Sequence, residues 1–208
     1  DACAAPGGKS ILAAEKAEKV LSRDVSAEKT ERIRENAQRM QMDNIEIQEW
    51  DARCFDPEKE GKADVVLLDV PCSGLGVMGK KRDIKYHITR EGMESLHALQ
   101  REIVDVCSRY VKPGGTLLYS TCTVNPAENE AMVRYIAEEL GFAPVSVEEE
   151  LPETLKAQKR ETAALRDAEG KKDGLNAEER RACIQLLPGY MAADGFFIAK
   201  FQKPLKAD

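Results

Sequence analysis

The stretch ADVVLLDVPCSGLG, from Ala63 to Gly76, is the part of the sequence that decides the fold. It begins as a short apolar run rich in valine and leucine, which is typical of a parallel strand covered on both faces. The run ends at Asp69, and Cys72 follows three residues later. A second apolar run, TLLYSTC, ends in Cys122. Two predicted strands that each lead into a cysteine raise the question of what chemistry lies at their ends.

Length and composition indicate one α/β domain. The chain has 208 residues, and its 42% hydrophobic content is enough for one such core or for one domain with an appendage. No signal peptide and no apolar span of about 18 residues is visible, so we expect a soluble, cytoplasmic protein with no membrane partner. The six cysteines form no C-x-x-C pair and there are only two histidines, which argues against a metal site and against a disulfide framework.

The charge balance bears on nucleic-acid binding. A formal net charge of −6 argues against a protein whose whole surface contacts phosphates. One local basic cluster exists, formed by Lys80, Lys81, Arg82 and Lys85. By itself this cluster fits a solvated loop as well as a phosphate-binding loop.

Segments with strand and helix patterns alternate along the chain. Strands are predicted at 19–24, 45–51, 63–72, 116–122 and 142–148, and helices at 9–18, 27–40, 94–110 and 126–140. The segment KPGG, residues 112–115, is expected to separate the third of these helices from the strand that follows. Such alternation predicts an open, mostly parallel sheet with helices on both faces.

The two ends of the chain and one internal segment depart from this alternation. The sequence opens at DACAAPGGKS, which resembles a strand end and a glycine turn, so we expect that the first strand is largely missing and that the chain is a fragment. Residues 148–181 are densely charged and are expected to form an exposed, partly mobile insertion without chemistry. The final runs CIQLLPG and DGFFIAKF predict an antiparallel hairpin at the sheet edge.

Ligands in open α/β sheets lie beyond the carboxyl ends of the strands. Asp24 ends the strand predicted at 19–24, at about the place where an acid commonly accepts hydrogen bonds from a ribose. Asp51, at the end of the strand predicted at 45–51, could accept a bond from an adenine amino group or could cap a helix. The turn Cys3–Lys9 brings two glycines and a lysine to the same edge, but it is neither a Walker A loop nor G-x-G-x-x-G. These features favour an adenosine ligand without phosphates.

The cysteines divide into two groups. Neighbouring parallel strands lie about 4.8 Å apart, so Cys72 and Cys122 are expected to face one cleft. Metal binding lacks further ligands there, and a structural disulfide does not suit a reducing compartment, which leaves nucleophilic chemistry. The remaining cysteines are interpreted as small buried hydrophobic residues; they are Cys3, Cys54, Cys107 and Cys183.

These residues resemble a known family, the S-adenosylmethionine-dependent RNA cytosine-5 methyltransferases, specifically the bacterial ribosomal RNA enzymes of the RsmB/Sun type. The motifs that carry the resemblance are DACAAPGGKS, LLDVPCSGLGV, DIKY, GGTLLYSTCTVNPAENE and LLPG followed by DGFFIAKF. In the related DNA enzymes the nucleophile is the cysteine of a proline-cysteine motif, whereas the RNA family uses a threonine-cysteine motif. This chain has both cysteines, which is the RNA pattern.

The resemblance implies a fold and a set of site residues. The fold is a Rossmann-like class I methyltransferase domain over residues 1–208, with a seven-stranded type of sheet. Cys122 would be the nucleophile, Cys72 would assist release of the enzyme, and Asp69 would touch the target base. Lys9 and the sulfonium of the cofactor are candidates for activating Cys122. S-adenosylmethionine would be surrounded by Cys3, Ala4, Ala5, Pro6, Gly7, Gly8, Lys9, Asp24, Asp51 and Asp69.

The resemblance also implies a partner. Ribosomal RNA would be the substrate, most specifically 16S ribosomal RNA, and the Lys80, Lys81, Arg82 and Lys85 cluster would hold its phosphates. The family carries an additional N-terminal RNA-binding domain that is absent from this chain, so we expect a monomer that by itself binds ribosomal RNA weakly. Two alternatives stay open at this point. The chain could be a truncated cofactor-binding module without activity, or a methyltransferase of the same fold that acts on another substrate.

Overall fold

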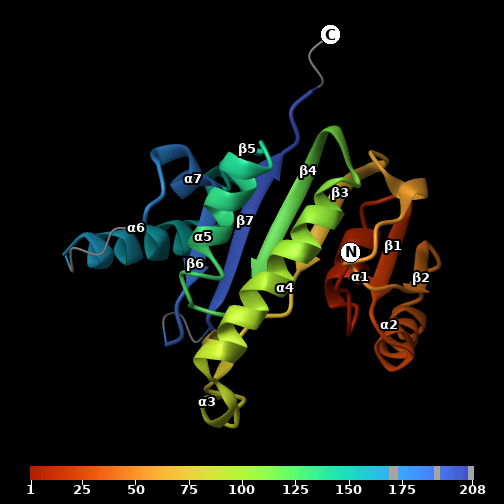
Figure 1. Cartoon of the computed structure of the whole chain (residues 1–208), viewed down its shortest axis with the longest axis horizontal. Helices are drawn as coiled ribbons and strands as arrows, with labels where there is room; N and C mark the ends of the chain where they lie inside the picture. Colours follow the sequence, from red (N-terminus) through yellow and green to blue (C-terminus); the bar gives the residue numbers. More distant parts are fainter. Residues whose placement is uncertain (169–172, 190–192, 206–208) are drawn as a thin grey trace.

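The computed structural model describes residues 1–168, 173–189 and 193–205, and Figure 1 shows their arrangement. Its strands are β1 (Val20–Asp24), β2 (Ile45–Glu49), β3 (Ala63–Asp69), β4 (Val111–Thr121), β5 (Ala143–Pro144), β6 (Cys183–Leu186) and β7 (Phe196–Gln202). The β1–β2 and β3–β4 pairs are parallel. Strand β7 runs antiparallel to β4, and β5 and β6 both pair antiparallel with β7. The predicted mixed sheet with a C-terminal antiparallel hairpin is confirmed.

Helices lie between these strands along the chain, at the predicted helical segments and also at 84–87 and within 148–181. They are α1 (Gly8–Ala14), α2 (Ala27–Arg39), α3 (Ile84–His87), α4 (Arg90–Ser108), α5 (Glu130–Arg134), α6 (Glu153–Ala168) and α7 (Ala177–Ala182). Short 3₁₀ turns lie at Pro57–Lys59, Leu75–Val77 and Glu148–Glu150, and a π-helical turn, Tyr135–Glu139, continues α5. Ser26 caps α2 by accepting a hydrogen bond from the Lys29 amide at 3.4 Å. Among the described residues, no helix is both long and apolar enough to cross a membrane.

The first residues of the chain join the two strand ladders. The Ala2 amide donates to the carbonyl of Leu67 in β3 at 3.1 Å. On the other side, the Arg23 amide of β1 donates to the Asp1 carbonyl at 2.8 Å, and the Ala4 amide donates to the Arg23 carbonyl at 3.0 Å. The segment 1–4 therefore lies between β1 and β3, and it aligns their carboxyl ends along one edge.

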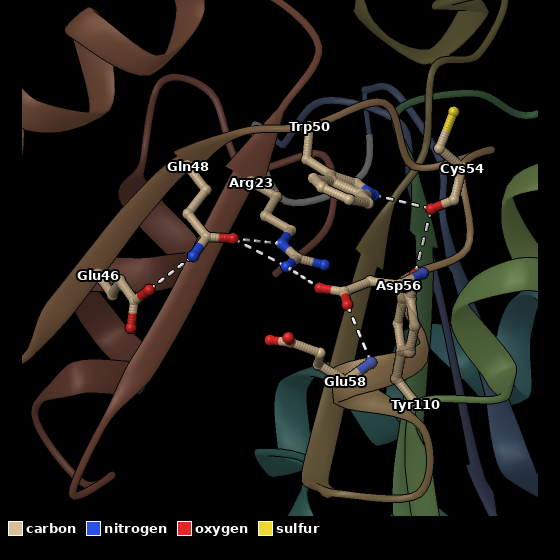
Figure 2. A network of polar contacts seen from close by, with 8 residues as sticks. All are labelled: Arg23, Glu46, Gln48, Trp50, Cys54, Asp56, Glu58 and Tyr110. Atoms are coloured by element: carbon tan, nitrogen blue, oxygen red, sulfur yellow. Dashed lines mark hydrogen bonds and ion pairs between the residues drawn. The ribbon is translucent and has the colours of Figure 1, made fainter.

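A buried polar network fastens β1 and β2 to the rest of the fold (Figure 2). The Arg23 guanidinium forms a buried ion pair with Asp56 and donates to Gln48 Oε1 at 3.0 and 2.8 Å. It also stacks 4.7 Å from the centre of the Trp50 ring. The Asp56 amide in turn donates to the hydroxyl of Tyr110, just before β4, at 2.9 Å. Because Arg23 is almost fully desolvated, both its charge and its hydrogen bonds require these partners.

The main hydrophobic core lies between β3, β4, β7 and the helices α4 and α5. Its fully buried members include Val104 of α4, Leu117 and Tyr119 of β4, and Phe197 and Phe201 of β7. Alternate residues of β7 are buried, which is the pattern of a strand with one face against the core. This core holds β3 and β4 in register and thereby fixes the edge where the candidate site lies.

The structure corrects three boundaries that the sequence predicted. The segment 112–115 lies inside β4, because the ladder with β3 runs from Ala63–Val111 to Val65–Thr116 and accommodates these residues as a bulge. The helix expected from residue 126 begins at Glu130, after a turn whose side chains bond to neighbouring loops. The strand expected at 142–148 contains only Ala143 and Pro144, since only these pair with β7.

The charged segment 148–181 also differs from the prediction. Helices α6 and α7 occupy most of it, and α6 packs on β6. Gln158 and Thr162 of α6 and Glu179 of α7 are buried, so the expectation of an exposed insertion is wrong for these described residues. With β6 the two helices border a cavity of about 420 Å³. Charged residues can form such helices because their side chains alternate between buried partners and solvent; residues 169–172 lie outside the described structure.

Three loops meet at two glycines beside the ends of β3 and β4. The Gly76 amide donates to the Cys122 carbonyl at 3.0 Å, and the Gly195 amide donates to the Gly76 carbonyl at 2.8 Å. A Cβ atom on Gly76 would lie 2.2 Å from the Gly195 carbonyl oxygen and 2.8 Å from that of Cys122. Both atoms belong to backbone, so they could not move aside without displacing the loops.

We predict that Gly76→Ala lowers the free energy of unfolding by about 1–3 kcal/mol, the usual cost of forcing extra atoms into a packed site. Chemical denaturation of the two proteins measures this difference. Gly79→Ala is the matched control, because a Cβ at Gly79 would meet nothing within 4 Å. Equal stability of the two variants would contradict the packing argument.

Candidate active site

The two cysteines that follow β3 and β4 lie against each other. In the parallel register Asp69 is opposite Ser120, so both chains leave the sheet at the same level. The Cys72 and Cys122 sulfurs are 3.2 Å apart, and the Cys122 amide donates to Cys72 Sγ at 3.3 Å. The structure thus brings together the pair that the sequence predicted to share one location.

The contact gives the two thiols different chemical properties. A hydrogen bond from Cys72 is the largest effect on Cys122 and lowers the pKa of the Cys122 thiol to about 7, although burial and the charge of Asp69 oppose this. The positive charge of Lys81 acts in the same direction as the hydrogen bond. The same contact, together with burial, raises the pKa of Cys72. The contact therefore favours the thiolate form at Cys122, with Cys72 as the hydrogen-bond donor.

Asp69 is held from two sides. Lys9 Nζ contacts Asp69 Oδ2 at 2.5 Å, and the Ser120 hydroxyl donates to Asp69 Oδ1 at 2.8 Å. Lys9 also lies 5.2 Å from the centre of the Phe196 ring. The expectation that Lys9 activates Cys122 is therefore corrected, because its ammonium group pairs with Asp69 and the activating hydrogen bond comes from Cys72.

The turn Cys3–Lys9 crosses the ends of β1 and β3. The Ala5 amide donates to Asp24 Oδ2 at 2.9 Å, and Asn36 Nδ2 of α2 donates to the Pro6 carbonyl at 2.9 Å. Gly7 has a positive φ of 103°, which favours glycine. A Cβ at Gly7 would also lie 3.1 Å from the side chain of Ile33 in α2. The conformation of the turn and its packing on α2 therefore both favour glycine at this position.

The residues before and after Gly7 have different surroundings. A Cβ at Gly8 would meet nothing within 4 Å, so the backbone there faces open space that a ligand could approach. Ala4 is buried, and Cys3 is half-buried, with a pKa that burial raises to about 12. Burial therefore disfavours the reactive thiolate form of Cys3.

Asp24 and Asp51 lie at neighbouring strand ends but bond differently. Asp24 is only 4% exposed, and besides Ala5 it accepts from its neighbour Val25 at 2.8 Å and pairs with Lys29 at 3.0 Å. Asp51 is half-buried and accepts from both the amide and the guanidinium of Arg53, which holds the pKa of the Asp51 carboxyl below its usual value. Asp24 therefore anchors the turn, whereas Asp51 is tied only to the residue two positions ahead.

The other cysteines and the basic cluster are as follows. Cys107 and Cys183 are buried as predicted, but Cys54 is exposed, which corrects its interpretation as a core residue. The Cys54 carbonyl accepts hydrogen bonds from the Trp50 indole and the Tyr110 hydroxyl, and the Cys54 side chain points away from both (Figure 2). All four cluster lysines and arginines are exposed, and Lys80 pairs with Asp194 at 2.6 Å. Within the described part of the chain, no group of three or more His, Cys, Asp or Glu side chains is arranged for a metal ion.

Comparison with known proteins identifies this arrangement. The family model described as 16S rRNA methyltransferase RsmB/F matches residues 1–202. The chain belongs to the RsmB/F family. A relative named ribosomal RNA small subunit methyltransferase B, from Shewanella oneidensis, is 34% identical over 98% of this chain and 42% of its own length. Another, from Bacillus subtilis and named probable ribosomal RNA small subunit methyltransferase B, is 36% identical over 98% of the chain and 42% of its length.

Solved structures agree on the fold. The crystal structure of PH0851 has a TM-score of 0.75 and 29% identity, and the match covers 97% of this chain and 41% of that one. NSun6 from Pyrococcus horikoshii, solved with SFG, has a TM-score of 0.70 and 24% identity over 98% of this chain and 47% of that one, which shows a shared fold. This RsmB/F chain spans about two fifths of the length of the curated relatives given above.

Sequence reasoning missed two polar residues of this RsmB/F site. Ser120, which donates a hydrogen bond to Asp69, lies in a predicted strand, where alternate residues face opposite sides of the sheet and a serine by itself does not indicate a functional role. Glu128, which bonds to the loops of both cysteines, was interpreted as part of the first turn of a helix, where acids are common. The motif around them could have indicated that they matter, but only the folded chain shows what they touch.

We predict that Cys72→Ala moves the midpoint of Cys122 alkylation upward from about pH 7 toward the ordinary thiol value of about 8.5. The thiolate is the reactive form, so alkylation rises as the pH passes the pKa, and loss of the donor raises that pKa. The experiment measures iodoacetamide labelling of the Cys122 peptide by mass spectrometry across pH 5.5–10. Cys54→Ala, at an exposed thiol outside the site, is the control and should leave the midpoint in place; an unchanged midpoint in Cys72→Ala would refute the hydrogen bond.

Proposed function

We propose that this RsmB/F domain transfers a methyl group from S-adenosylmethionine to C5 of a cytosine in ribosomal RNA, most specifically 16S ribosomal RNA, through a covalent adduct with Cys122. The observation that carries the proposal is the 3.2 Å contact between a lowered-pKa thiol and a second thiol at adjacent strand ends. A buried structural cysteine needs neither feature. The relatives named above support the substrate class, since their names state that they methylate small-subunit ribosomal RNA.

The residues at the strand ends suit an adenosine cofactor. Carboxylates at the ends of β1 and β2, Asp24 and Asp51, are acceptors of the kind that bind ribose hydroxyls and an adenine amino group. Open space beside Gly8 leaves room for a ligand to approach the turn, and the triphosphate-binding motifs of nucleotide hydrolases are absent from the sequence. When bound, S-adenosylmethionine supplies a methyl group on a positively charged sulfur, which is electrophilic. Cys3–Lys9 and Asp69 would complete its surroundings.

The cysteines would perform the covalent steps. C5 of cytosine is a weak nucleophile, so the ring has to be activated before it can accept a methyl group. Addition of the Cys122 thiolate to C6 forms a carbon–sulfur bond and moves an electron pair toward N3, which makes C5 nucleophilic. Asp69, fixed by Ser120 and Lys9, would lie where it can contact the target base. After C5 is methylated, its proton passes to a base such as water, the electron pair of that C–H bond re-forms the C5–C6 double bond, and the C6–sulfur bond breaks so that Cys122 leaves as a thiolate. Cys72, whose thiol lies in hydrogen-bonding contact with that sulfur, would assist this last step.

The target base has to reach this edge from outside a helix. RNA offers such bases in single-stranded loops or as splayed nucleotides. Lys81, Arg82 and Lys85 are exposed on the chain that continues from the Cys72 loop, and Lys85 lies 4.8 Å from the ring centre of the exposed Tyr86. Cations beside an aromatic ring form a suitable contact for phosphates and an unstacked base.

We predict that RNA containing 5-fluorocytidine traps a covalent complex with the protein in the presence of S-adenosylmethionine, because fluorine at C5 blocks the final elimination. Cys122→Ala should form none. With unmodified RNA, Cys72→Ala should accumulate an adduct that the unaltered protein releases. Denaturing gel electrophoresis detects both species, with Cys54→Ala as the control. Equal adduct levels in Cys72→Ala and Cys122→Ala would refute the division of roles, and cofactor binding by calorimetry without methyl transfer would refute the proposed activity.

We predict that a triple reversal, Lys81→Glu with Arg82→Glu and Lys85→Glu, weakens RNA binding and lowers the slope of log affinity against log salt by about three. Filter binding at several salt concentrations measures the slope. Lys62→Glu, a charge reversal at an exposed lysine before β3 and at the opposite end of the sheet, is the control and should leave the slope unchanged. An unchanged slope in the triple variant would place the RNA elsewhere.

A further inference from the structure

Glu128 is a fully buried carboxylate between the loops of the two cysteines. Its Oε1 accepts from the Ser73 hydroxyl at 2.5 Å and from Asn125 Nδ2 at 2.9 Å. Its Oε2 accepts from the Ser73 amide at 2.9 Å and from Gln100 Nε2 at 2.9 Å. An ionised carboxylate has about four lone-pair sites, so these four neutral donors fill its capacity.

The donors belong to three different segments of the chain, namely the Cys72 loop, the loop after Cys122, and α4. Ser73 directly follows Cys72, and Asn125 lies three residues beyond Cys122. Gln100 belongs to α4, and its amide also donates to the carbonyl of Pro71, the residue before Cys72, at 2.8 Å. Glu128 therefore holds the Cys72 loop on both sides of the cysteine, directly through Ser73 and indirectly through Gln100.

The carboxylate is itself fixed to the strand that carries Cys122. The Tyr119 hydroxyl of β4 donates to the Glu128 carbonyl at 2.7 Å, and the next residue, Asn129, accepts from Thr121 at 2.6 Å and donates to the Thr123 carbonyl at 3.0 Å. Glu128 thus cannot follow the Cys72 loop if that loop moves away. Glu128 thus links the two cysteine loops from a position anchored to β4, next to the direct bond between the Ser73 and Thr123 hydroxyls at 2.8 Å.

The energetic cost of this arrangement points to a purpose beyond packing. A charge buried among neutral groups costs several kcal/mol relative to water, and hydrogen bonds repay only part of that. An apolar side chain of similar size would fill the same volume more cheaply, but it could not accept from the Ser73 and Gln100 amides. A hydrogen bond to sulfur weakens quickly with distance and angle, so the Cys72–Cys122 contact is sensitive to small shifts of either loop.

We propose that Glu128 is the positioning residue that holds the Cys72 thiol in hydrogen-bonding contact with the Cys122 sulfur. The catalytic purpose of that contact rests on the proposed function, whereas the contact itself does not. Without Glu128 the Pro71–Ser73 segment loses two direct bonds and the support of Gln100, and Cys122 loses its donor. The charged groups then left facing Cys122 are Asp69, which disfavours the thiolate, and Lys81, which favours it. His97 of α4 lies next to Asn125, at 3.5 Å.

The test compares the pH profile of Cys122 alkylation in Glu128→Ala, Glu128→Gln and Ser73→Ala. We expect the midpoint to rise by about one pH unit or more in Glu128→Ala, toward the ordinary thiol value of about 8.5. Glu128→Gln should shift it less, because the amide oxygen still accepts from the Ser73 and Gln100 nitrogens while its NH₂ group meets the Ser73 hydroxyl and the Asn125 amide. Ser73→Ala, which removes one donor, should also give a smaller shift.

The control is Glu179→Gln. Glu179 is buried to the same degree, at 1% exposed, but its carboxylate accepts from the Asn176 amide in the capping box of α7. This variant should lose stability on thermal denaturation while its Cys122 profile stays in place. This control separates a specific shift of the Cys122 pH profile from the general loss of stability caused by substitution of a buried acid. If Glu128→Ala does not fold, Glu128→Gln and Ser73→Ala carry the comparison.

The proposal is overturned if every folded variant at Glu128 and Ser73 keeps the midpoint of the unaltered protein, or if Glu179→Gln shifts it equally. Alkylation requires neither RNA nor cofactor, so its outcome is independent of methyl transfer. An unaltered protein that transfers no methyl group would refute the proposed function but leave this result standing. Normal transfer together with an unchanged profile in the variants would refute the positioning role alone.

Discussion

The parallel register of β3 and β4 is the constraint on which the site depends. It places Asp69 beside Ser120, and the two chains therefore leave the sheet at the same level, with Cys72 and Cys122 at nearly equal distances beyond. A shift of one residue in this pairing would turn every side chain of a strand to the other face. The core between α4, β4 and β7 prevents such a shift, because Leu117, Tyr119 and Phe197 would have to leave it. The chemistry of two sulfurs is in this sense a consequence of hydrophobic packing.

The loops beyond the strands are positioned mainly by polar contacts and by the absence of side chains. Gly76 lets its loop approach the Cys122 carbonyl within hydrogen-bonding distance, and Gly195 brings a third loop against Gly76 in the same way. Asp24 and Lys9 attach the N-terminal turn to two different strands, and the Arg23 network ties the β1–β2 ladder to the chain before β4. These groups are partly or fully desolvated, so each becomes costly to leave unpaired. A site built in this way keeps its geometry without a rigid element at every position.

The two cysteines illustrate how environment divides labour between identical side chains. Both are partly buried, and burial alone would raise the pKa of each thiol. The hydrogen bond between them shifts the two pKa values in opposite directions, lowering that of Cys122 and raising that of Cys72. Glu128 links the two loops that carry the sulfurs, because its carboxylate accepts hydrogen bonds from both.

The sequence by itself determined the order of strands and helices, the hairpin at the end, the edge that carries the site, and the pairing of Cys72 with Cys122. These follow from local periodicity and from the rule that parallel strands end at one edge, so neighbouring residues are enough to predict them. It misjudged the segment 148–181, the exposure of Cys54 and the partner of Lys9. Only the tertiary structure decided these points and the contacts of Glu128. The contacts of Lys9 with Asp69 and of Glu128 with Ser73 and Gln100 join residues 28 to 60 positions apart, whose approach no local pattern encodes. Burial and hydrogen-bond partners are properties of the assembled core. An acid near the start of a helix, such as Glu128, can therefore be a solvated cap or a buried hydrogen-bond acceptor, depending on which residues of the rest of the chain pack against it.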